Sequence, residues 1–362
     1  MCRAWRPESP PTHPEVINDE FAEGGLHRLS IIGSLREGFE TLNRKLWLLL
    51  FPVLLDLWLW LGPEISGKPV LHRLVTAFLK SARQLQPGDW YKGTEKLLAS
   101  MEGVNLSMLL ANELVGLPSF VATATKLPMP DSWHRTVFAV HTPLGLVVVL
   151  FGLFVIGLFI SALFYKIAVV ALLQGNDQLP SPGKFAKGVV NAWLQSFLFT
   201  IILFVGIMTL AVPMSFGVAF ITLISPSLGM GSMGFFLMLL SWAIVIVLFF
   251  LAFSIEAVVW DDINILDGMR RSITVVNRYF WATLGFLVLS NVLVLGFSVI
   301  WKRLTFSPAG VTVSIIGNAY IGVGVALAGL IFYKSRYTMI FEEKLTESME
   351  KALGDGGKSL DE

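Results

Sequence analysis

Four ionisable residues lie within or at the ends of long apolar runs, where a charged group is costly. Asp56 lies inside the run 46–62, Lys166 and Glu256 lie a few residues before the ends of two other runs, and Lys302 ends a fourth. A charge at the bilayer centre costs roughly 2.5–3.5 kcal/mol on insertion scales, so such residues often line an ion pathway or form internal pairs. The spacing makes two pairs geometrically feasible, Asp56 with Lys302 and Lys166 with Glu256, and these four are the candidate intramembrane polar residues.

Each candidate also has a purely structural interpretation. Asp56 would then make a structural hydrogen bond or ion pair, or reach the outer interface of the membrane. Lys166 would extend its ammonium group to the membrane surface, and Glu256 would face that same interface. The sequence leaves the functional and structural alternatives open.

The chain has none of the residue spacings expected of common catalytic or cofactor sites. Its five histidines form no HExxH pair, and there is no GxSxG motif, P-loop or GxGxxG following a strand. Cys2 is the only cysteine, which excludes an intrachain disulfide and a cysteine metal cage. We therefore expect no catalytic residues, no metal and no cofactor. The net charge of +1 gives no indication of nucleic-acid binding.

The apolar runs indicate that lipid is the solvent for much of the chain. Of the 362 residues 54% are hydrophobic and only 15% are charged, whereas a soluble domain carries about 25% charged residues. Residues 281–301 carry no charge, and about 21 residues suffice to cross a ~30 Å hydrocarbon core. The sequence predicts an all-α polytopic transmembrane bundle of about six spans, at 46–62, 143–173, 198–224, 233–259, 281–301 and 311–332.

An amphipathic helix is predicted before three of these spans. In the helix near 264–280, Asn264 is the expected N-cap and Asp267 lies in the first turn. Its apolar stripe has a +4, +3, +4 spacing, in Met269, Ile273, Val276 and Phe280. The same spacing recurs from Leu35 and from Ala186. We therefore predict three helical hairpins, each preceded by an interfacial helix, near 34–45, 182–196 and 264–280.

Ser34 and Glu37 have the spacing of a capping box, which predicts that the first interfacial helix begins at Ser34. Asp261 and Asp262, in contrast, follow an apolar run, and two adjacent carboxylates indicate that the chain has reached water or headgroups there.

The basic residues near span ends predict the orientation of the chain. They gather on the side of the three interfacial helices, which by the positive-inside rule is the cytoplasm, with both termini. We expect these residues to contact anionic lipid, each worth about 1 kcal/mol near the surface. The predicted lipid-contacting residues are Arg36, Arg44, Lys45, Lys184, Lys187, Arg270, Arg271 and Arg278.

The remaining segments follow from this arrangement. The proline-rich residues 1–27 are expected to form a disordered cytoplasmic tail. Residues 28–62 hold the first interfacial helix and first span, and residues 143–341 hold the five-span bundle. Residues 342–362 are expected to form a polar cytoplasmic tail. The insertion 63–142 is expected outside the cytoplasm, with short amphipathic helices at 71–85, from near 89, and at 106–114.

Residues 266–272, LDGMRRS, and 277–281, NRYFW, resemble a bacterial integral-membrane family. It is the family related to the membrane domain attached to some glycerophosphodiester phosphodiesterases. The segment 47–62, with Pro52 and Asp56, resembles the opening of stand-alone relatives. The resemblance covers about 254–290 clearly and 30–60 and 160–205 more faintly, but not the insertion 63–141.

The resemblance implies a helical membrane domain in a bacterial cell membrane. It does not imply hydrolase activity, because the catalytic barrel and its His-Arg-Gly motif are missing: His27-Arg28 is followed by Leu29.

Three hypotheses on function follow. The first is a non-enzymatic multi-pass membrane protein that contacts lipid or binds a protein partner of unknown identity. The second is a transporter or permease component with Asp56, Lys166 and Glu256 along its path. The third, an intramembrane lipid enzyme, lacks the clustered acid, base or nucleophile that it requires.

Overall fold

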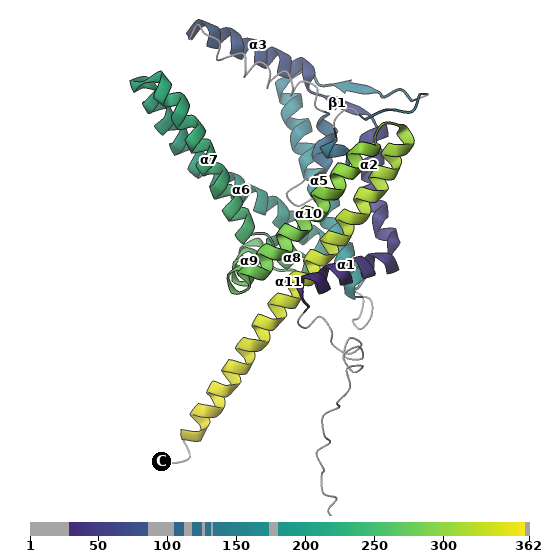
Figure 1. Ribbon diagram of the computed structural model, residues 1–362, viewed down its shortest axis with the longest axis vertical. Coiled ribbons are helices and arrows are strands. Elements are labelled where there is room, and N and C mark those ends of the chain that lie inside the picture. The colour runs from purple at the N-terminus through teal and green to yellow at the C-terminus, as the bar shows by residue number, and fades with distance from the viewer. Residues whose placement is uncertain are drawn as a thin grey trace, which may run out of the picture.

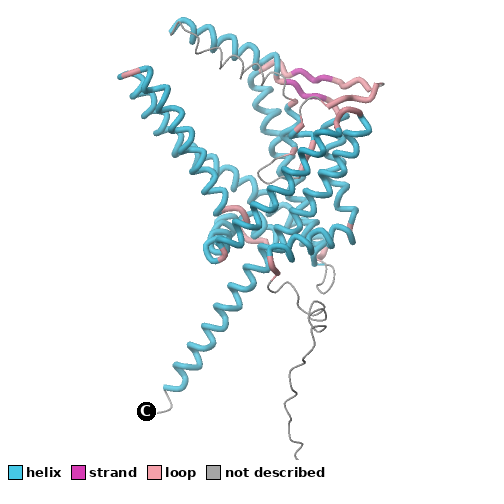
Figure 2. Tube along the Cα trace, viewed as in Figure 1, coloured by secondary structure: helices cyan, strands magenta, loops and turns pink. Residues whose placement is uncertain are grey.

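The computed structural model covers the 362-residue chain and describes residues 29–85, 105–111, 118–124, 127–131, 133–173 and 180–358. Helices dominate these residues, and two short strands pair at one end (Figure 2). The predicted tail 1–27 and the helix predicted from near residue 89 lie outside the described residues. The predicted all-α polytopic fold is confirmed.

Five helical stretches in the described part of the chain are long and apolar enough to cross a membrane. They are α5 (Pro143–Leu173), α6 (Pro182–Ile224), Gly231–Asp261 within α7 (Pro226–Phe250) and α8 (Ser254–Asp261), α10 (Phe280–Leu304), and Pro308–Glu343 of α11 (Pro308–Lys358). The predicted first span is shorter, since η3 (Leu46–Leu49) and α2 (Leu50–Leu61) together rise roughly 25 Å.

The first part of α11 packs within the bundle and is the most buried of the five spans, and its C-terminal part projects away from the other helices (Figure 1). In its most apolar 18-residue window 72% of residues are buried, compared with 6% for the stretch Gly231–Asp261. Helix α1 (Ile31–Arg44) lies across α11 at a contact of small residues. A Cβ atom added at Gly38 would lie 2.7 Å from both Gly324 O and Ala328 N. The two backbones therefore approach as closely as glycine allows.

Helices α1 and α9 (Ile265–Arg278) lie at one end of the spans and run across them (Figure 1). Asn264 caps α9 as predicted, because its side chain accepts a hydrogen bond from Asp267 N at 2.9 Å. The predicted capping box of the first helix is wrong. Ser30 is the N-cap there, and Ser34 lies buried one turn inside, with its hydroxyl donating to Ser30 O at 3.1 Å.

The helix predicted near 182–196 is not separate from its span. It forms the first part of α6, which is continuous over 43 residues. Helix α1 ends at Arg44 and α9 ends at Arg278, because the C-cap residues Lys45 and Tyr279 leave the helical conformation. No residue near 197 leaves the helical conformation, so α6 runs from the predicted surface helix into the span without a break.

Helix breaks and extensions also differ from prediction in the second half of the chain. The returning span breaks at residues 251–253, where Ser272 of α9 accepts from Phe253 N at 3.1 Å and donates to Phe250 O at 2.8 Å. The predicted polar tail 342–362 is helical as far as Lys358, because its many Glu, Lys, Leu and Met residues favour helix.

The insertion contains α3 (Lys68–Leu85), η4 (Leu106–Leu110) and η5 (Val121–Thr123). The structure thus has a helix where the stripe at 71–85 predicts one, and a short 3-10 helix within 106–114. The sequence analysis did not predict strands β1 (Glu64–Ser66) and β2 (Val137–Ala139), which pair in parallel with Ile65 opposite Phe138.

We predict that Gly38→Ala destabilises the protein, because the new methyl group meets the backbone of α11. The expected loss is about 1–3 kcal/mol of unfolding free energy. Thermal unfolding in detergent would measure it. Gly152→Ala on α5, where nothing lies within 4 Å of the added atom, is the matched control and should be neutral or stabilising. Equal melting temperatures for the two variants would contradict the α1–α11 contact.

Candidate functional site

Two lysines from different spans meet the adjacent carboxylates at the end of α8. Lys166 Nζ lies 2.5 Å from Asp262 Oδ1 and 2.7 Å from Val259 O. Lys334 Nζ lies 2.9 Å from Asp261 Oδ1. Each lysine is the last residue of a Phe-Tyr-Lys triplet near the end of its span, on α5 and α11. The lysines of the two similar triplets therefore both bind the end of α8.

Arg271 of α9 joins this cluster. Its guanidinium group pairs with Asp261 and lies over the ring of Tyr337, 4.6 Å from the centroid. Asp261 is only 17% exposed and Asp262 is 57% exposed. Helix α8 ends at these two residues, where Asp262 is exposed and Asp261 is largely covered by its two cationic partners. That the chain reaches water or headgroups there stays a prediction.

Helix α6 holds the same loop from another side. Asn191 Nδ2 donates to Asp262 O at 3.2 Å, and Gln195 Oε1 accepts from Ile265 N at 2.8 Å. Gly188 leaves room for the lysine–aspartate pair, because a Cβ atom there would lie 3.2 Å from Asp262 Oδ1. The polar face predicted for the surface helix at 182–196 thus binds protein with these residues.

The predicted pair of Lys166 and Glu256 is wrong. The packing of α5 against α8 places the ammonium group of Lys166 at the carboxyl end of α8, beside Asp262, six residues beyond Glu256. Lys166 is 6% exposed, so it does not extend to the membrane surface either.

The predicted pair of Asp56 and Lys302 is also wrong. The fully buried Asp56 carboxylate accepts hydrogen bonds from the Ser119 hydroxyl, from Phe120 N at 2.9 Å and from Val121 N at 3.3 Å. A buried carboxylate on an apolar helix can accept hydrogen bonds from backbone N–H groups of a neighbouring loop that would otherwise lack a partner. Asp56 thus has the structural role, and it fixes the loop at 118–123 against α2.

Glu256 lies at the bottom of a large cavity between the α6–α7 hairpin and α10. We call this the lateral cavity; it has a volume of about 1120 Å³. The α6–α7 hairpin diverges from α10 with distance from α8 and α9 (Figure 1). Val245 of α7 and Val292, Leu295 and Val299 of α10 line the cavity and are each more than half exposed. The cavity therefore opens sideways at the depth of the spans.

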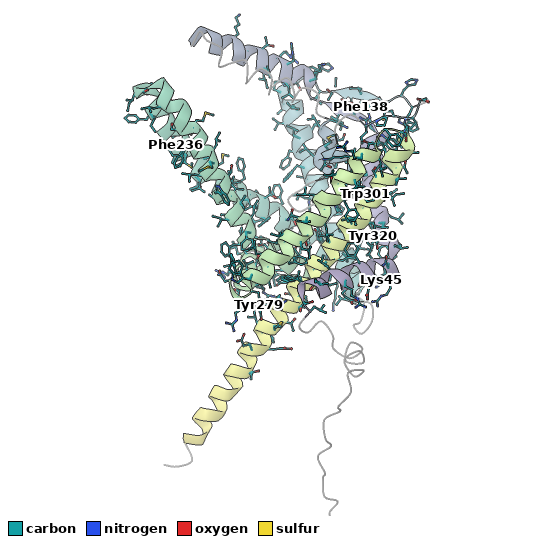
Figure 3. The ribbon with its side chains drawn as sticks, in the orientation of Figure 1. Lys45, Phe138, Phe236, Tyr279, Trp301 and Tyr320 are labelled. Atoms are coloured by element: carbon teal, nitrogen blue, oxygen red, sulfur yellow. The ribbon has the colours of Figure 1, made fainter. Side chains whose placement is uncertain are left out.

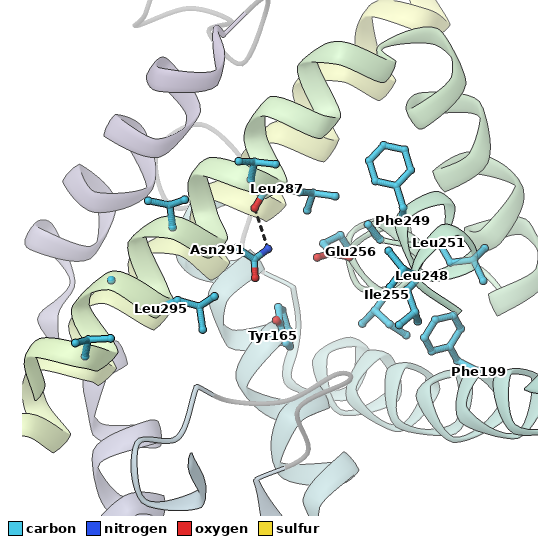
Figure 4. A pocket seen from close by; sticks show the side chains of 16 residues that line it. Tyr165, Phe199, Leu248, Phe249, Leu251, Ile255, Glu256, Leu287, Asn291 and Leu295 are labelled. Carbon is cyan, nitrogen blue, oxygen red and sulfur yellow. Dashed lines mark hydrogen bonds between the residues drawn. The ribbon is translucent and has the colours of Figure 1, made fainter. Parts of the chain in front are cut away.

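The lateral cavity combines an apolar wall with a small polar floor. Its wall consists of aliphatic and phenylalanine side chains, including Phe199 and Phe249. Glu256 faces α10, and Tyr165 and Asn291 border the same space (Figure 4). This composition is typical of sites for small molecules, where few polar groups fix the orientation of an apolar ligand.

A second cavity of about 580 Å³ adjoins the first; we call it the inner cavity. The two share six lining residues, which are Tyr165, Ala252, Glu256, Leu287, Asn291 and Leu295. The inner cavity continues between α10 and α11 to Ser298, Lys302 and Asn318. The structure therefore brings Glu256 and Lys302 to one connected space, while Asp56 and Lys166 do not line it.

The inner cavity contains a polar group that the described residues do not satisfy. The Ser290 side chain is 6% exposed and its hydroxyl has no hydrogen-bond partner there. A Cβ atom added at Gly329 of α11 would lie 3.8 Å from Glu256 Oε1, so α11 leaves space beside the carboxylate. Buried polar groups normally have partners, and an unsatisfied hydroxyl on a cavity wall is available to a ligand.

Most of the basic residues predicted to contact lipid have partners within the chain. Arg36 pairs with Glu40 at 2.5 Å, and this hydrogen bond lowers the pKa of Glu40. Arg44 lies 3.5 Å from Glu37, and Lys45 donates to the carbonyl of Ala171.

On α9, Arg270 pairs with Asp267 at 3.2 Å and Arg278 pairs with Glu343 at 2.6 Å. Lys184 and Lys187 are exposed at the start of α6. The charge that this end offers to lipid is thus smaller than a count of Lys and Arg indicates.

In the described part of the chain no group of three His, Cys, Asp or Glu residues could hold a metal ion. The prediction that there is no catalytic, cofactor or metal site stays a prediction.

The sequence analysis missed Tyr165, Ser290 and Asn291 as candidate site residues. Ser290 and Asn291 are adjacent polar residues in the middle of the uncharged run 281–301. That position was the available signal, because an amide at mid-membrane depth tends to face the interior of a bundle. Tyr165 carried no separate signal, since tyrosine is common near span ends.

The fold defines a polytopic α-helical membrane protein with a laterally open cavity. Comparison of the chain with protein-family models, curated proteins and solved structures found no match. The resemblance to the phosphodiesterase-associated membrane family therefore stays a prediction.

We predict that Lys166 is energetically coupled to Asp262 and not to Glu256. A double-mutant cycle with Lys166→Met and Asp262→Asn should give a coupling of about 0.5–3 kcal/mol in unfolding free energy, because the two side chains are in contact. The cycle with Lys166→Met and Glu256→Gln is the control and should be additive. Coupling to Glu256 of equal size would contradict the arrangement in the structure.

Proposed function

We propose that this chain is a non-enzymatic multi-pass protein of the cell membrane that binds an amphipathic lipid in the lateral cavity. The observation that carries the proposal is the opening of this cavity between α7 and α10, with apolar walls and a polar floor at Glu256. A ligand entering from the bilayer would keep its hydrocarbon in contact with apolar groups throughout. Its headgroup would leave the membrane interface only where protein groups replace water.

The size and wall of the cavity support a lipid rather than a polar solute. Ligand cavities commonly measure roughly 300–1,000 Å³, and the lateral cavity is slightly larger than that. The α6–α7 hairpin presents large apolar side chains to its surroundings on both helices, among them Phe204, Phe220 and Trp242. The mouth of the cavity would therefore open into lipid, and a solute from water would have to pass through that lipid to reach the cavity.

A second candidate function, transport, uses the same two cavities. The observation that favours it is their continuity, since they share Glu256 and Asn291 and extend to Lys302. A ligand moving from the lateral into the inner cavity would pass from the floor toward the far end of α10. A protein that only holds its ligand needs no such extension.

We predict that Gly296→Trp abolishes lipid retention. Gly296 lines the lateral cavity and nothing lies within 4 Å of its added Cβ atom, so the indole would occupy the cavity without a backbone clash. Native mass spectrometry of detergent-purified protein should show loss of a bound lipid. Gly206→Trp on α6 has the same open surroundings but does not line the cavity, and it is the matched control. Retention of lipid by Gly296→Trp would contradict the proposal that the lipid binds in the lateral cavity.

The same pair of variants separates binding from transport. In liposomes, a transporter would move labelled phospholipid between leaflets in the unaltered protein and in Gly206→Trp, but not in Gly296→Trp. Lipid retention without such movement would leave the binding function and remove the transport candidate.

For the orientation, we propose that both termini and the end carrying α1 and α9 face the cytoplasm of a bacterial cell. Lys45 and Tyr279 lie at this end and Phe138 at the opposite end (Figure 3). The exposed Lys184 and Lys187 support contact of this end with anionic lipid, because both lie just before the apolar part of α6. We propose no particular protein partner, and we propose no binding of nucleic acid.

We predict that a membrane-impermeant thiol reagent labels Lys184→Cys only from the cytoplasmic side and Phe138→Cys only from the other side, in a Cys2→Ser background. Both positions are exposed. Oriented vesicles would provide the measurement, and labelling of both positions from one side would refute the proposed orientation.

A further inference from the structure

We infer that the headgroup bound in the lateral cavity carries a primary amine, held as an ammonium ion by Glu256. This inference rests on the proposed function and adds the chemical class of the ligand. The same chemistry is present in an aminophospholipid of the bilayer and in a free long-chain amine.

The first argument is that the Glu256 carboxylate faces the cavity without a basic partner from the protein. Among the described residues, Glu256 has no ion pair, since Lys166 is bound to Asp262. Lys302 is 11 residues beyond Asn291 on α10, which corresponds to roughly 16 Å of helix. A carboxylate in an apolar cavity requires a cation or a proton, and none of the side chains that the structure describes supplies the cation.

The second argument is the arrangement of hydrogen-bonding groups around this carboxylate. An ammonium group has three donors and no acceptor. The Nδ2 atom of Asn291 donates to Leu287 O at 2.9 Å within α10, which leaves its Oδ1 atom as an acceptor (Figure 4). The unpartnered Ser290 hydroxyl lines the adjoining inner cavity. The Glu256 carboxylate and the amide oxygen of Asn291 both border the lateral cavity and offer acceptors to these donors.

The third argument is the aromatic rings of the lateral cavity. Tyr165 and Phe249 both line it. Rings attract a cation at their faces, and the attraction grows when water is excluded. A phosphate or carboxylate headgroup would meet the charge of Glu256 instead. The phosphate of an aminophospholipid would therefore have to lie nearer the mouth of the cavity than its amine.

The test is isothermal titration of the full chain in detergent with dodecylamine, dodecanol and dodecanoate. Dodecylamine should bind about tenfold more tightly than the other two, because only its ammonium group forms an ion pair with the Glu256 carboxylate. Glu256→Gln should lose this preference. Glu343→Gln, which removes an exposed carboxylate outside the cavity, is the matched control and should keep it. Dihexanoyl-phosphatidylethanolamine, tested alongside, would show whether the amine is accepted on a phospholipid.

Failure of the headgroup inference and failure of the proposed function give different results. Equal binding of the three ligands, unaffected by Glu256→Gln but lost in Gly296→Trp, would overturn the amine and leave the cavity as a lipid site. Binding that is the same in Gly296→Trp and in the unaltered chain would show only partition into detergent, and both proposals would fall.

Discussion

The structure depends on the charge cluster at the end of α8. The consecutive carboxylates of Asp261 and Asp262 each bind a lysine from a different span, Lys334 of α11 and Lys166 of α5. Three spans that are far apart in the chain thus meet at one point. The apolar residues around them cannot specify this contact alone, because an apolar side chain in a membrane is in an apolar environment whether it faces lipid or another helix. The directional contacts of the lysines supply that specificity.

This cluster also accounts for the position of the cavity. Polar contacts hold α5, α6, α8 and α11 together at one end of the bundle. Farther along, the α6–α7 hairpin has no comparable polar contacts with α10 among the described residues, and only 11% of the most apolar window of α6 is buried. The hairpin therefore diverges from the bundle (Figure 1), and Glu256 lines the cavity between them.

The helices were predictable from local features of the sequence. The contacts between helices were not, because they depend on how the helices are arranged in space. The Asn264 cap and the uncharged run at 281–301 determine α9 and α10 almost to the residue. The partner of Lys166 depends on how α5 rotates against α8, which no spacing within one helix records. The cavity depends on the angle between α7 and α10 in the same way. Ser290 and Asn291 were readable as polar residues at mid-membrane depth, but not as neighbours of Glu256.

The length of α11 has a consequence for what lies beyond the bilayer. Its 51 residues correspond to roughly 76 Å, more than twice the thickness of the hydrocarbon core. Arg278 of α9 forms an ion pair with Glu343 of α11, and another 15 residues of helix follow to Lys358. That extension is a rigid spacer, roughly 22 Å long. A domain or protein attached to its far end would stand off the lipid surface at a set height, and would rotate whenever the central helix of the bundle turned.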